Sequence, residues 1–320
     1  VGKLYVQKYF PESSKERMVQ LVKNLQSAFA QRIEENTWMT AATKAKALEK
    51  LQAFDIKIGY PDKWQNMDSV FVIDDAKSLL DNVKNVQEAA SKYIISKRWG
   101  KPVDKKLWHM TPQTVNAYYD PSTNSINFPA AILQPPFFDP EVDDAANYGA
   151  IGAVIGHEMS HGFDDQGCQF DKEGNMKNWW TDEDKKNYDA RTKVLVDWFN
   201  QQEVIPGLKV NGEKTLGENI GDNGGLNVAY RALENSMKQN SLTDKDGFTP
   251  SQRFFLAWGR VWASNVAPQF VAYIVNSDVH SPNVSRVNAA LPMIDAWYKA
   301  FDIKEGDKLF VPQEKRAHIW

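Results

Sequence analysis

The first third of the chain is patterned as amphipathic helices. Between about Ser13 and Lys57, apolar residues recur every three or four positions, the spacing of residues on one face of an α-helix. This stretch predicts a pair of helices, which the turn residues of GYPDKW end. A further helix is predicted over about Asp75 to Arg98. The apolar positions of the helical pair are Met18, Val19, Leu21, Val22, Leu25, Ala28, Phe29, Ala45, Leu48, Leu51 and Ala53.

From about Val103 the pattern shortens to alternating polar and β-favouring residues. The segment TVNAYYDPSTNSINFP has such residues on both sides of a Pro-Ser-Thr-Asn turn and predicts a β-hairpin. The prolines of LQPPFFDP indicate a stiff loop, after which helical spacing returns. Helices are predicted over about Asn147–Phe163, Asp182–Phe199, Glu218–Gln239, Pro250–Ala267 and Leu291–Phe301.

Composition narrows the possible functions. The chain has 320 residues, 42% of them hydrophobic and 12% aromatic, so it can bury the core of one large domain or of two. A net charge of −3, from 38 basic and 41 acidic residues, provides no electrostatic basis for binding nucleic acid. Cys168 is the single cysteine, which excludes an internal disulfide and a cysteine-rich zinc site. There is no uninterrupted apolar run of about 18 residues, so no transmembrane segment is predicted in this chain.

The segment VIGHEMSHGFDDQG, residues 154–167, carries the clearest chemical signal. His157 and His161 are four residues apart and share one face of the predicted helix, so both imidazoles can bind one tetrahedral zinc ion. Glu158 follows the first histidine and can reach a water molecule on that metal. The alternative is a chance match on an ordinary buried helix. A third ligand on a separate element distinguishes the two interpretations.

The best source of a third ligand is TLGENIGDNGGL, residues 215–226. Glu218 and Asp222 are four residues apart, so a helix that starts near Gly217 points both carboxylates the same way. One carboxylate could bind zinc while the other accepts the outer N–H of a ligand histidine. The alternative is a helix N-terminus whose acidic residues only complement the helix dipole.

Four motifs resemble those of the neprilysin and endothelin-converting enzyme family of zinc metallopeptidases, including its bacterial PepO-like members. They are NAYYDPSTNSINFPAAILQPPFF, VIGHEMSHGFDDQG, GENIGDNGGL and SDVHSPNVSRVNAAL, and the resemblance spans the whole chain. It implies an α+β, predominantly helical fold with a thermolysin-like (gluzincin) catalytic domain, a small β-sheet and a zinc-bearing active-site helix. That domain is expected over residues 96–320, and residues 1–95 are expected to be a helical lead-in and interdomain segment.

The resemblance also implies a role for each matching residue. One zinc ion per chain would be held by His157, His161 and Glu218, with Glu158 as general base and proton shuttle. Asp222 would orient His157 from behind. The other implied roles are His280 as oxyanion stabiliser, Asp278 as its orienting carboxylate, Arg286 as binder of a substrate carbonyl, Asn116 and Ala117 as holders of the peptide backbone, and Asp164 and Asp165 as local support of the zinc helix.

The chemistry of peptide hydrolysis agrees with these roles. Zinc lowers the pKa of a bound water toward about 7, so a neighbouring carboxylate can take its proton. A histidine and an arginine can then stabilise the developing negative charge. The resemblance implies an apolar pocket for the side chain that follows the scissile bond, so cleavage is expected on the amino side of bulky hydrophobic residues, although each residue of this pocket could equally be a core residue. The pocket positions are Ile132, Phe138, Val154, Val261 and Trp262, with a small residue, Ala153, that implies a roomier pocket than in some members.

The resemblance leaves several alternatives open. Family members are longer, and the N-terminal half that forms a lid over their cleft is expected to be absent from this chain. The expected binding partners are therefore peptide substrates and that N-terminal half. The ending RAHIW has Ala317 where animal members carry a cysteine, which indicates a bacterial protein. The protein is expected to be exported and to be periplasmic, extracellular or lipid-anchored. A cytoplasmic location is the alternative. The competing functions are a zinc aminopeptidase and a non-catalytic, metal-binding half-protein that needs its N-terminal segment.

Overall fold

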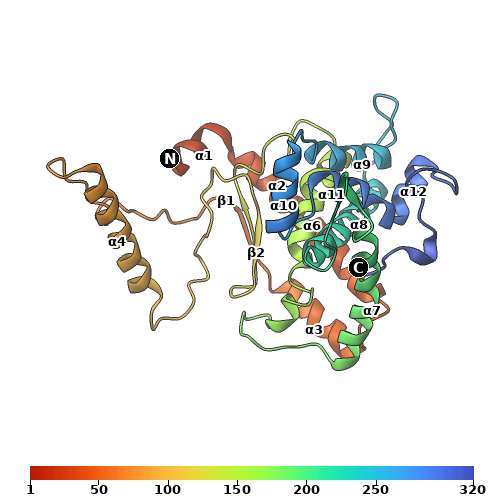
Figure 1. Cartoon of the computed structure of the whole chain (residues 1–320), viewed down its shortest axis with the longest axis horizontal. Helices are drawn as coiled ribbons and strands as arrows, with labels where there is room; N and C mark the ends of the chain where they lie inside the picture. The colour runs from red at the N-terminus through yellow and green to blue at the C-terminus, as the bar shows by residue number, and fades with distance from the viewer.

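Helices form most of the protein, and two small sheets complete it (Figure 1). The computed structural model describes residues 1–320. None of its helices combines the length and the apolar composition that a membrane crossing requires. The helices are α1 (Gly2–Tyr9), α2 (Glu12–Glu35), α3 (Ala41–Gln52), α4 (Leu79–Arg98), α5 (Asp144–Asn147), α6 (Ala153–Ser160), α7 (Asp182–Phe199), α8 (Leu216–Gln239), α9 (Pro250–Val261), α10 (Pro268–Ser277), α11 (Asn283–Asn288) and α12 (Asp295–Phe301). The strands are β1 (Asp55–Gly59), β2 (Tyr118–Asp120), β3 (Ser125–Pro129), β4 (Glu203–Ile205) and β5 (Leu208–Lys209).

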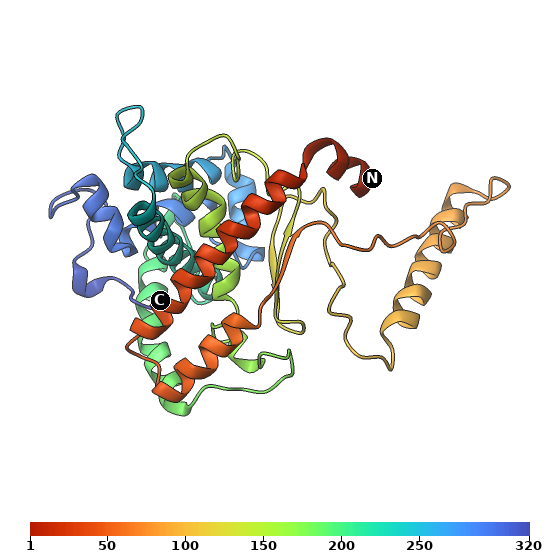
Figure 2. The ribbon, with the colours of Figure 1, turned by 180° about the vertical axis from the view of Figure 1, so that it is seen from behind.

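The first helical pair packs on the body that contains α6 and α8. α2 is the long helix that crosses the back of the molecule (Figure 2). The predicted pair is confirmed, but its second helix ends at Gln52, and the helical prediction as far as Lys57 is wrong. The chain forms β1 from Asp55 onward because Ile56 and Ile58 alternate with polar residues, which is the period of a strand.

The larger sheet has three strands in the order β1-β3-β2. β2 and β3 form the predicted antiparallel hairpin, with Tyr119 opposite Ile126. In its turn, Asn124 adopts a φ of 49°, a left-handed conformation that asparagine tolerates better than most residues. β1 pairs in parallel with β3, so that Ile56 also lies opposite Ile126. Every residue of the central strand β3 is buried, and the hairpin is therefore anchored in the core.

Several later helices differ from their predicted bounds. α7 has its predicted bounds. The helix predicted over 147–163 contains a π-helical turn over 148–152 and ends at Ser160. Within that turn, a Cβ on Gly149 would lie 2.0 Å from the carbonyl oxygen of Phe254, so the irregular turn accompanies close packing on α9. The helix predicted over 250–267 ends at Val261, and α10 starts anew at Pro268, because proline suits a first helical turn. The sequence did not predict α10 or α11.

α6 and α8 cross closely at two glycines. A Cβ on Gly156 would lie 2.9 Å from the Cα of Gly225. A Cβ on Gly225 would lie 2.2 Å from the carbonyl oxygen of Ala153. Side chains do not tolerate such distances, so only glycine allows the helices to approach this closely. The crossing brings together the two helices that carry the expected zinc ligands.

Gly225→Ala is expected to lower the free energy of unfolding by about 3 kcal/mol, because the added methyl group must displace the backbone of α6. Urea unfolding followed by circular dichroism measures this change. Gly259→Ala in α9 is the matched control, since the nearest atom to its added Cβ is 4.0 Å away. That variant should be neutral or more stable by up to about 1 kcal/mol. Equal stabilities of the two variants would contradict the close crossing.

A buried carboxylate joins the N-termini of α3 and α7. Asp184 accepts hydrogen bonds from the backbone N–H of Thr40 (2.7 Å) and from the hydroxyls of Thr43 (2.6 Å) and Thr181 (2.6 Å). Burial raises the pKa of Asp184, but these hydrogen bonds outweigh burial and hold the pKa below its usual value. One side chain therefore caps two helices that are far apart in the sequence.

Asp184→Ala is expected to cost about 3 kcal/mol of stability, because the buried hydroxyl of Thr43 and the part-buried donors of Thr40 and Thr181 lose their acceptor. The folded-state pKa is depressed, so this stabilisation is complete above the unfolded-state pKa of about 3.9 and is lost as pH falls through the folded-state pKa. Urea unfolding of both proteins between about pH 7 and pH 3 tests the sign. The stability difference should shrink in acid, and a difference that does not change with pH would contradict the role of the charge.

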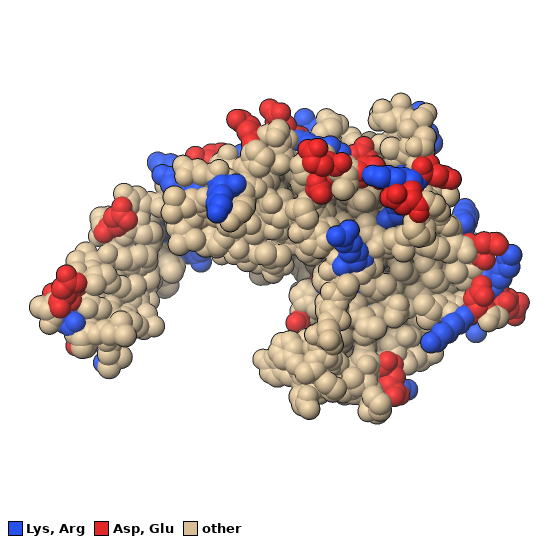
Figure 3. Space-filling model, turned by 90° about the horizontal axis from the view of Figure 1, so that it is seen from above, with Lys and Arg blue, Asp and Glu red and all other residues tan.

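Residues 65–106 leave the body as an arm that carries α4 (Figure 1). The predicted helix is confirmed with a later start, where the hydroxyl of Ser78 accepts a hydrogen bond from the backbone N–H of Asp81. Few charged side chains lie on the face of the arm seen in Figure 3, and a hollow separates the arm from the body. An exposed apolar surface of this kind is typical of a contact site. The exposed apolar residues of the arm are Phe71, Val72, Ile73, Leu79, Leu80, Val83, Ile94, Ile95, Trp99 and Val103.

Candidate metal centre and cleft

Three potential ligand atoms converge where α6 and α8 meet. His157 and His161 project from the C-terminal end of α6 and Glu218 from the first turn of α8, and their ligand atoms all lie within 4.8 Å of one another. The two Nε2 atoms are 3.1 Å apart. Oε2 of Glu218 lies 3.0 Å from Nε2 of His157 and 3.6 Å from Nε2 of His161. Two imidazole nitrogens and one carboxylate oxygen fit a zinc ion that keeps its fourth position open.

A carboxylate contacts the far side of each histidine ring. Oδ1 of Asp222 lies 2.9 Å from Nδ1 of His157, and Oδ2 of Asp164 lies 3.0 Å from Nδ1 of His161. Each carboxylate favours the tautomer that leaves Nε2 free for a metal. Of the two acidic residues in the first two turns of α8, Glu218 thus lies at the ligand atoms and Asp222 behind the ring. The sequence suggested only local support from Asp164, and the structure places it directly on His161.

The electrostatics of the cluster favour a cation. Burial raises the pKa of Glu218, but hydrogen bonds with the surrounding histidines outweigh burial and hold the pKa far below its usual value. Burial lowers the pKa values of His157 and His161, but their carboxylate partners raise both above the usual value. The two histidine rings therefore hold protons more strongly than a free imidazole while Glu218 stays ionised, and a metal ion that binds there replaces ring protons.

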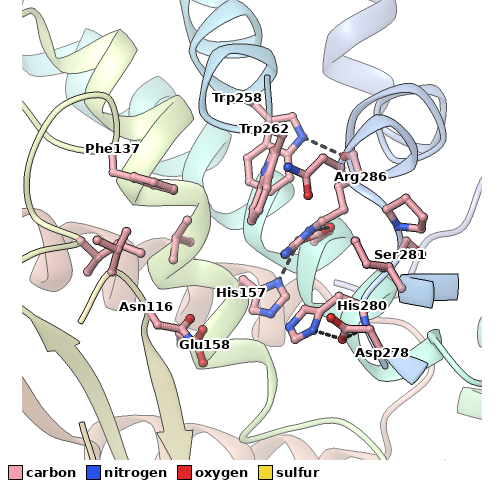
Figure 4. Close-up of a pocket in the computed structure, with 17 residues that line it drawn as sticks. Asn116, Phe137, His157, Glu158, Trp258, Trp262, Asp278, His280, Ser281 and Arg286 are labelled. Atoms are coloured by element: carbon pink, nitrogen blue, oxygen red, sulfur yellow. Dashed lines mark hydrogen bonds and ion pairs between the residues drawn. The ribbon is translucent and has the colours of Figure 1, made fainter. Parts of the chain in front are cut away.

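A cleft of about 280 Å³ opens beside His157, and His280, which contacts Glu218, also lines it (Figure 4). Glu158 and Asn116 lie near one another on one wall, while His280 and Asp278 lie on another. Glu158 directly follows His157 on α6 and is mostly buried, yet it lines the cleft. The structure therefore places a carboxylate beside the ligand group and facing the space that a substrate would fill.

His280 reaches the ligand group from the loop after α10. Its Nδ1 lies 2.8 Å from Oδ1 of Asp278, which also accepts the backbone N–H of His280. Its Nε2 lies 3.2 Å from Oε2 of Glu218. The hydrogen bond with Glu218 raises the pKa of His280 to about 8, against the opposite effect of burial. The two carboxylates therefore favour the protonated ring, whose N–H groups point toward Asp278 and Glu218.

Arg286 lies largely buried at the back of the cleft. Its Nε donates to Oδ2 of Asp222 (2.8 Å) and its Nη2 donates to Oδ1 (2.6 Å). The guanidinium stacks 3.7 Å from the ring centre of Trp262. Burial lowers the pKa of Arg286, but the charge of Asp222 outweighs burial and raises it. Since Asp222 also contacts His157, one carboxylate connects the arginine of the cleft to the ligand group.

The apolar wall of the cleft agrees only in part with the residues expected from the sequence. Ile132, Val154 and Trp262 line it, and Val115, Trp258 and Ile274 join them. The prediction of Phe138 is wrong, because that side chain is 1% exposed in the core and the adjacent Phe137 lines the cleft instead. Val261 and Ala117 also lie outside the cleft lining, whereas Asn116 is part of it.

Trp258 could have been found from the sequence. It lies four residues before Trp262 on α9, so both indoles share one helical face. Its ring packs 5.5 Å from that of Trp262, and its Nε1 donates a hydrogen bond to the carbonyl oxygen of Arg286 (3.0 Å). The tryptophan pair therefore supports the arginine. No such signal exists for Ile274, which lies on the unpredicted helix α10.

Comparison with known proteins agrees with this arrangement. Residues 116–317 match the sequence profile of Peptidase family M13, and residues 1–61 match a second profile of the same family. The chain belongs to peptidase family M13. The first match alone covers more than half of this M13 chain and includes every expected zinc ligand.

Individual relatives are longer than this chain. The neutral endopeptidase of Lactobacillus helveticus is 39% identical over 320 residues, which are 100% of this chain and 47% of the relative. Neprilysin of Homo sapiens is 35% identical over 332 residues, which cover 100% of this chain and 44% of the relative. A crystal structure of Mycobacterium tuberculosis zinc metalloprotease Zmp1 in complex with an inhibitor superposes with a TM-score of 0.94 at 46% identity, covering 100% of this chain and 49% of that one. This M13 chain thus spans about half the length of the relatives that it matches.

Proposed function

We propose that this M13 chain provides the catalytic site of a zinc-dependent endopeptidase that cleaves oligopeptides on the amino side of bulky hydrophobic residues. The observation that carries the proposal is the convergence of His157, His161 and Glu218 beside a cleft that Glu158 lines. The family membership and the resemblance to neutral endopeptidases support it. The three ligand side chains would hold one zinc ion, which when bound makes water acidic enough to be a nucleophile at neutral pH.

The side chains of the cleft divide the remaining chemistry between them. Glu158 would accept the proton of the attacking water and pass it to the leaving amine. His280, oriented by Asp278, would donate a hydrogen bond to the carbonyl oxygen as negative charge develops on it. Arg286 would bind a backbone carbonyl of the substrate, held in place by Asp222. Asn116 would hold the peptide backbone at the opposite wall.

The apolar wall supports the proposed specificity. Phe137, Val154 and Trp262 line the cleft next to Arg286, and a large hydrophobic side chain would replace water there. A substrate whose backbone is bound by the arginine would direct its next side chain toward this wall. Cleavage before phenylalanine or leucine is therefore expected over cleavage before small or charged residues.

The test uses an internally quenched peptide with one central phenylalanine and an acetylated amino terminus. The expected result is an internal cut on the amino side of phenylalanine, identified by mass, which a chelator abolishes and added zinc restores. Cleavage only of a peptide with a free amine would favour the aminopeptidase. Zinc binding without any cleavage would favour the non-catalytic alternative, in which the chain needs its N-terminal segment.

We also propose that the arm is covered by the part of the family fold that this chain does not contain. The arm exposes Leu79, Leu80 and Trp99 by more than half of their surface, and relatives are about twice as long as the matched region. In this proposal residues 1–95 connect that part to a catalytic domain over 96–320. Adding the N-terminal region of a relative as a separate chain should raise the peptidase rate, and Trp99→Lys should weaken that effect.

The expected export of the protein stays a prediction.

A further inference from the structure

A buried lysine of α3 contacts the turn that follows the zinc helix but none of the three expected zinc ligands. Lys50, near the end of α3, is 1% exposed. Its Nζ donates to the carbonyl oxygens of Gly167 and Phe170, each at 2.7 Å. The ammonium also lies 5.5 Å from the ring centre of Trp179 and 5.8 Å from that of Tyr119. An ammonium can be buried at this depth only if its hydrogen bonds are made, so these contacts define where the Gly167–Phe170 turn must lie.

The turn that Lys50 holds is the one that positions Asp164. The backbone N–H of Gly167 donates to Oδ1 of Asp164 at 2.7 Å, and the N–H of Gln166 donates to the same oxygen at 2.9 Å. The other carboxylate oxygen, Oδ2, contacts Nδ1 of His161 at 3.0 Å. Gly167 therefore accepts from Lys50 through its carbonyl group and donates to Asp164 through its N–H. A continuous path of hydrogen bonds runs from α3 to a zinc ligand.

The geometry leaves little freedom along this path. A Cβ on Gly167 would lie 2.1 Å from the carbonyl oxygen of His161, so the turn is packed directly against the end of the zinc helix. The backbone of Lys50 is itself fixed, because its carbonyl oxygen accepts from the side chain of Asn124 (3.2 Å). The hydroxyl of Tyr119 in β2 donates to that asparagine (3.0 Å). Lys50 thus connects the hairpin of β2 and β3 to the turn behind His161.

We propose that Lys50 is a positioning residue of the metal centre, acting through the Gly167–Phe170 turn and Asp164 to hold the His161 ring in its metal-binding orientation. The proposal rests on the proposed zinc function. Lys50 is not a catalytic residue, because it does not line the cleft. Losing its two hydrogen bonds frees the turn, lets the carboxylate of Asp164 move, and leaves His161 free to rotate. Loss of a carboxylate behind a ligand histidine typically weakens metal binding by about 10- to 100-fold.

The test compares Lys50→Met with Lys57→Met in the zinc-loaded protein. Lys57 in β1 is the matched control, since it is also a buried lysine, 7% exposed, whose Nζ donates to a backbone carbonyl, that of Leu107 (3.1 Å). Both variants lose a buried ammonium, and both should lose stability. Only Lys50→Met should release zinc to a chelator about tenfold faster and change the visible absorption spectrum of the cobalt-substituted protein. Should Lys50→Met fail to fold, Lys50→Gln, which keeps one shorter donor, takes its place.

A second background shows whether Lys50 acts through Asp164. Zinc release should already be faster in Asp164→Asn, and adding the Lys50 substitution should change it by less than about twofold. Equal zinc release by Lys50→Met and Lys57→Met, or a full tenfold effect of Lys50→Met in the Asp164→Asn background, would overturn the proposal while the wild-type protein still binds zinc and cleaves peptide. A wild-type protein that binds no zinc would overturn the proposed function itself.

Discussion

Glu158→Gln is expected to lower kcat for peptide hydrolysis by about a thousandfold or more while zinc stays bound. Glutamine keeps the size of the side chain and removes its ability to accept the proton of the attacking water, which typically accounts for a factor of about 10² to 10⁴. Glu158 is not one of the three converging ligands, so zinc affinity should change little. The rate on a quenched peptide and the zinc content of the dialysed protein measure the two effects separately.

Glu218→Gln is the informative control for this experiment. The amide is a poorer zinc ligand, and the side chain faces both ligand histidines, so this variant should lose zinc and activity together. Glu158→Gln should lose activity alone. If Glu158→Gln kept a tenth of the wild-type kcat, another group would have to be the base, and the position of Glu158 on the cleft wall would need another explanation.

The metal centre could be predicted from the sequence because its geometry is mostly local. Two histidines four residues apart share a helical face whatever the rest of the fold does. The same holds for Glu218 and Asp222 on α8, although their spacing did not say which of the two binds the metal. The family resemblance implied Glu218, and in the structure Glu218 faces the ligand group while Asp222 lies behind His157. The hairpin of β2 and β3 was predictable for a similar reason, since its turn and both strands lie within one short segment.

The parts that escaped prediction depend on contacts between distant segments. β1 is short and pairs in parallel with β3, a pairing that no local turn specifies. In the doublet Phe137-Phe138, one ring lines the cleft and the other enters the core, and two identical neighbours carry no signal for which is which. Lys50 looks like any lysine on an amphipathic helix, because its partners at Gly167 and Phe170 are backbone carbonyls that sequence patterns do not reveal.

Asp222→Ala is expected to be the most damaging single change to stability and zinc binding together. Asp222 is 2% exposed and carries the contacts of both Arg286 and His157. Its removal leaves a buried guanidinium without a counter-charge, which typically costs about 3 to 5 kcal/mol. It also frees the His157 ring, so zinc affinity should fall by about 10- to 100-fold. Urea unfolding of the zinc-free protein and competition with a chelator measure the two losses.

Asp278→Ala provides the matched control, because Asp278 also contacts a histidine of the site but is 44% exposed and pairs with no arginine. Its loss should cost less than about 1 kcal/mol of stability and leave zinc affinity unchanged. Combining Asp222→Ala with Arg286→Met removes the unpaired charge, so most of the lost stability should return, while zinc affinity should stay low because His157 still lacks its partner. Recovery of both properties in the double variant would show that Asp222 serves the arginine alone and does not orient the histidine.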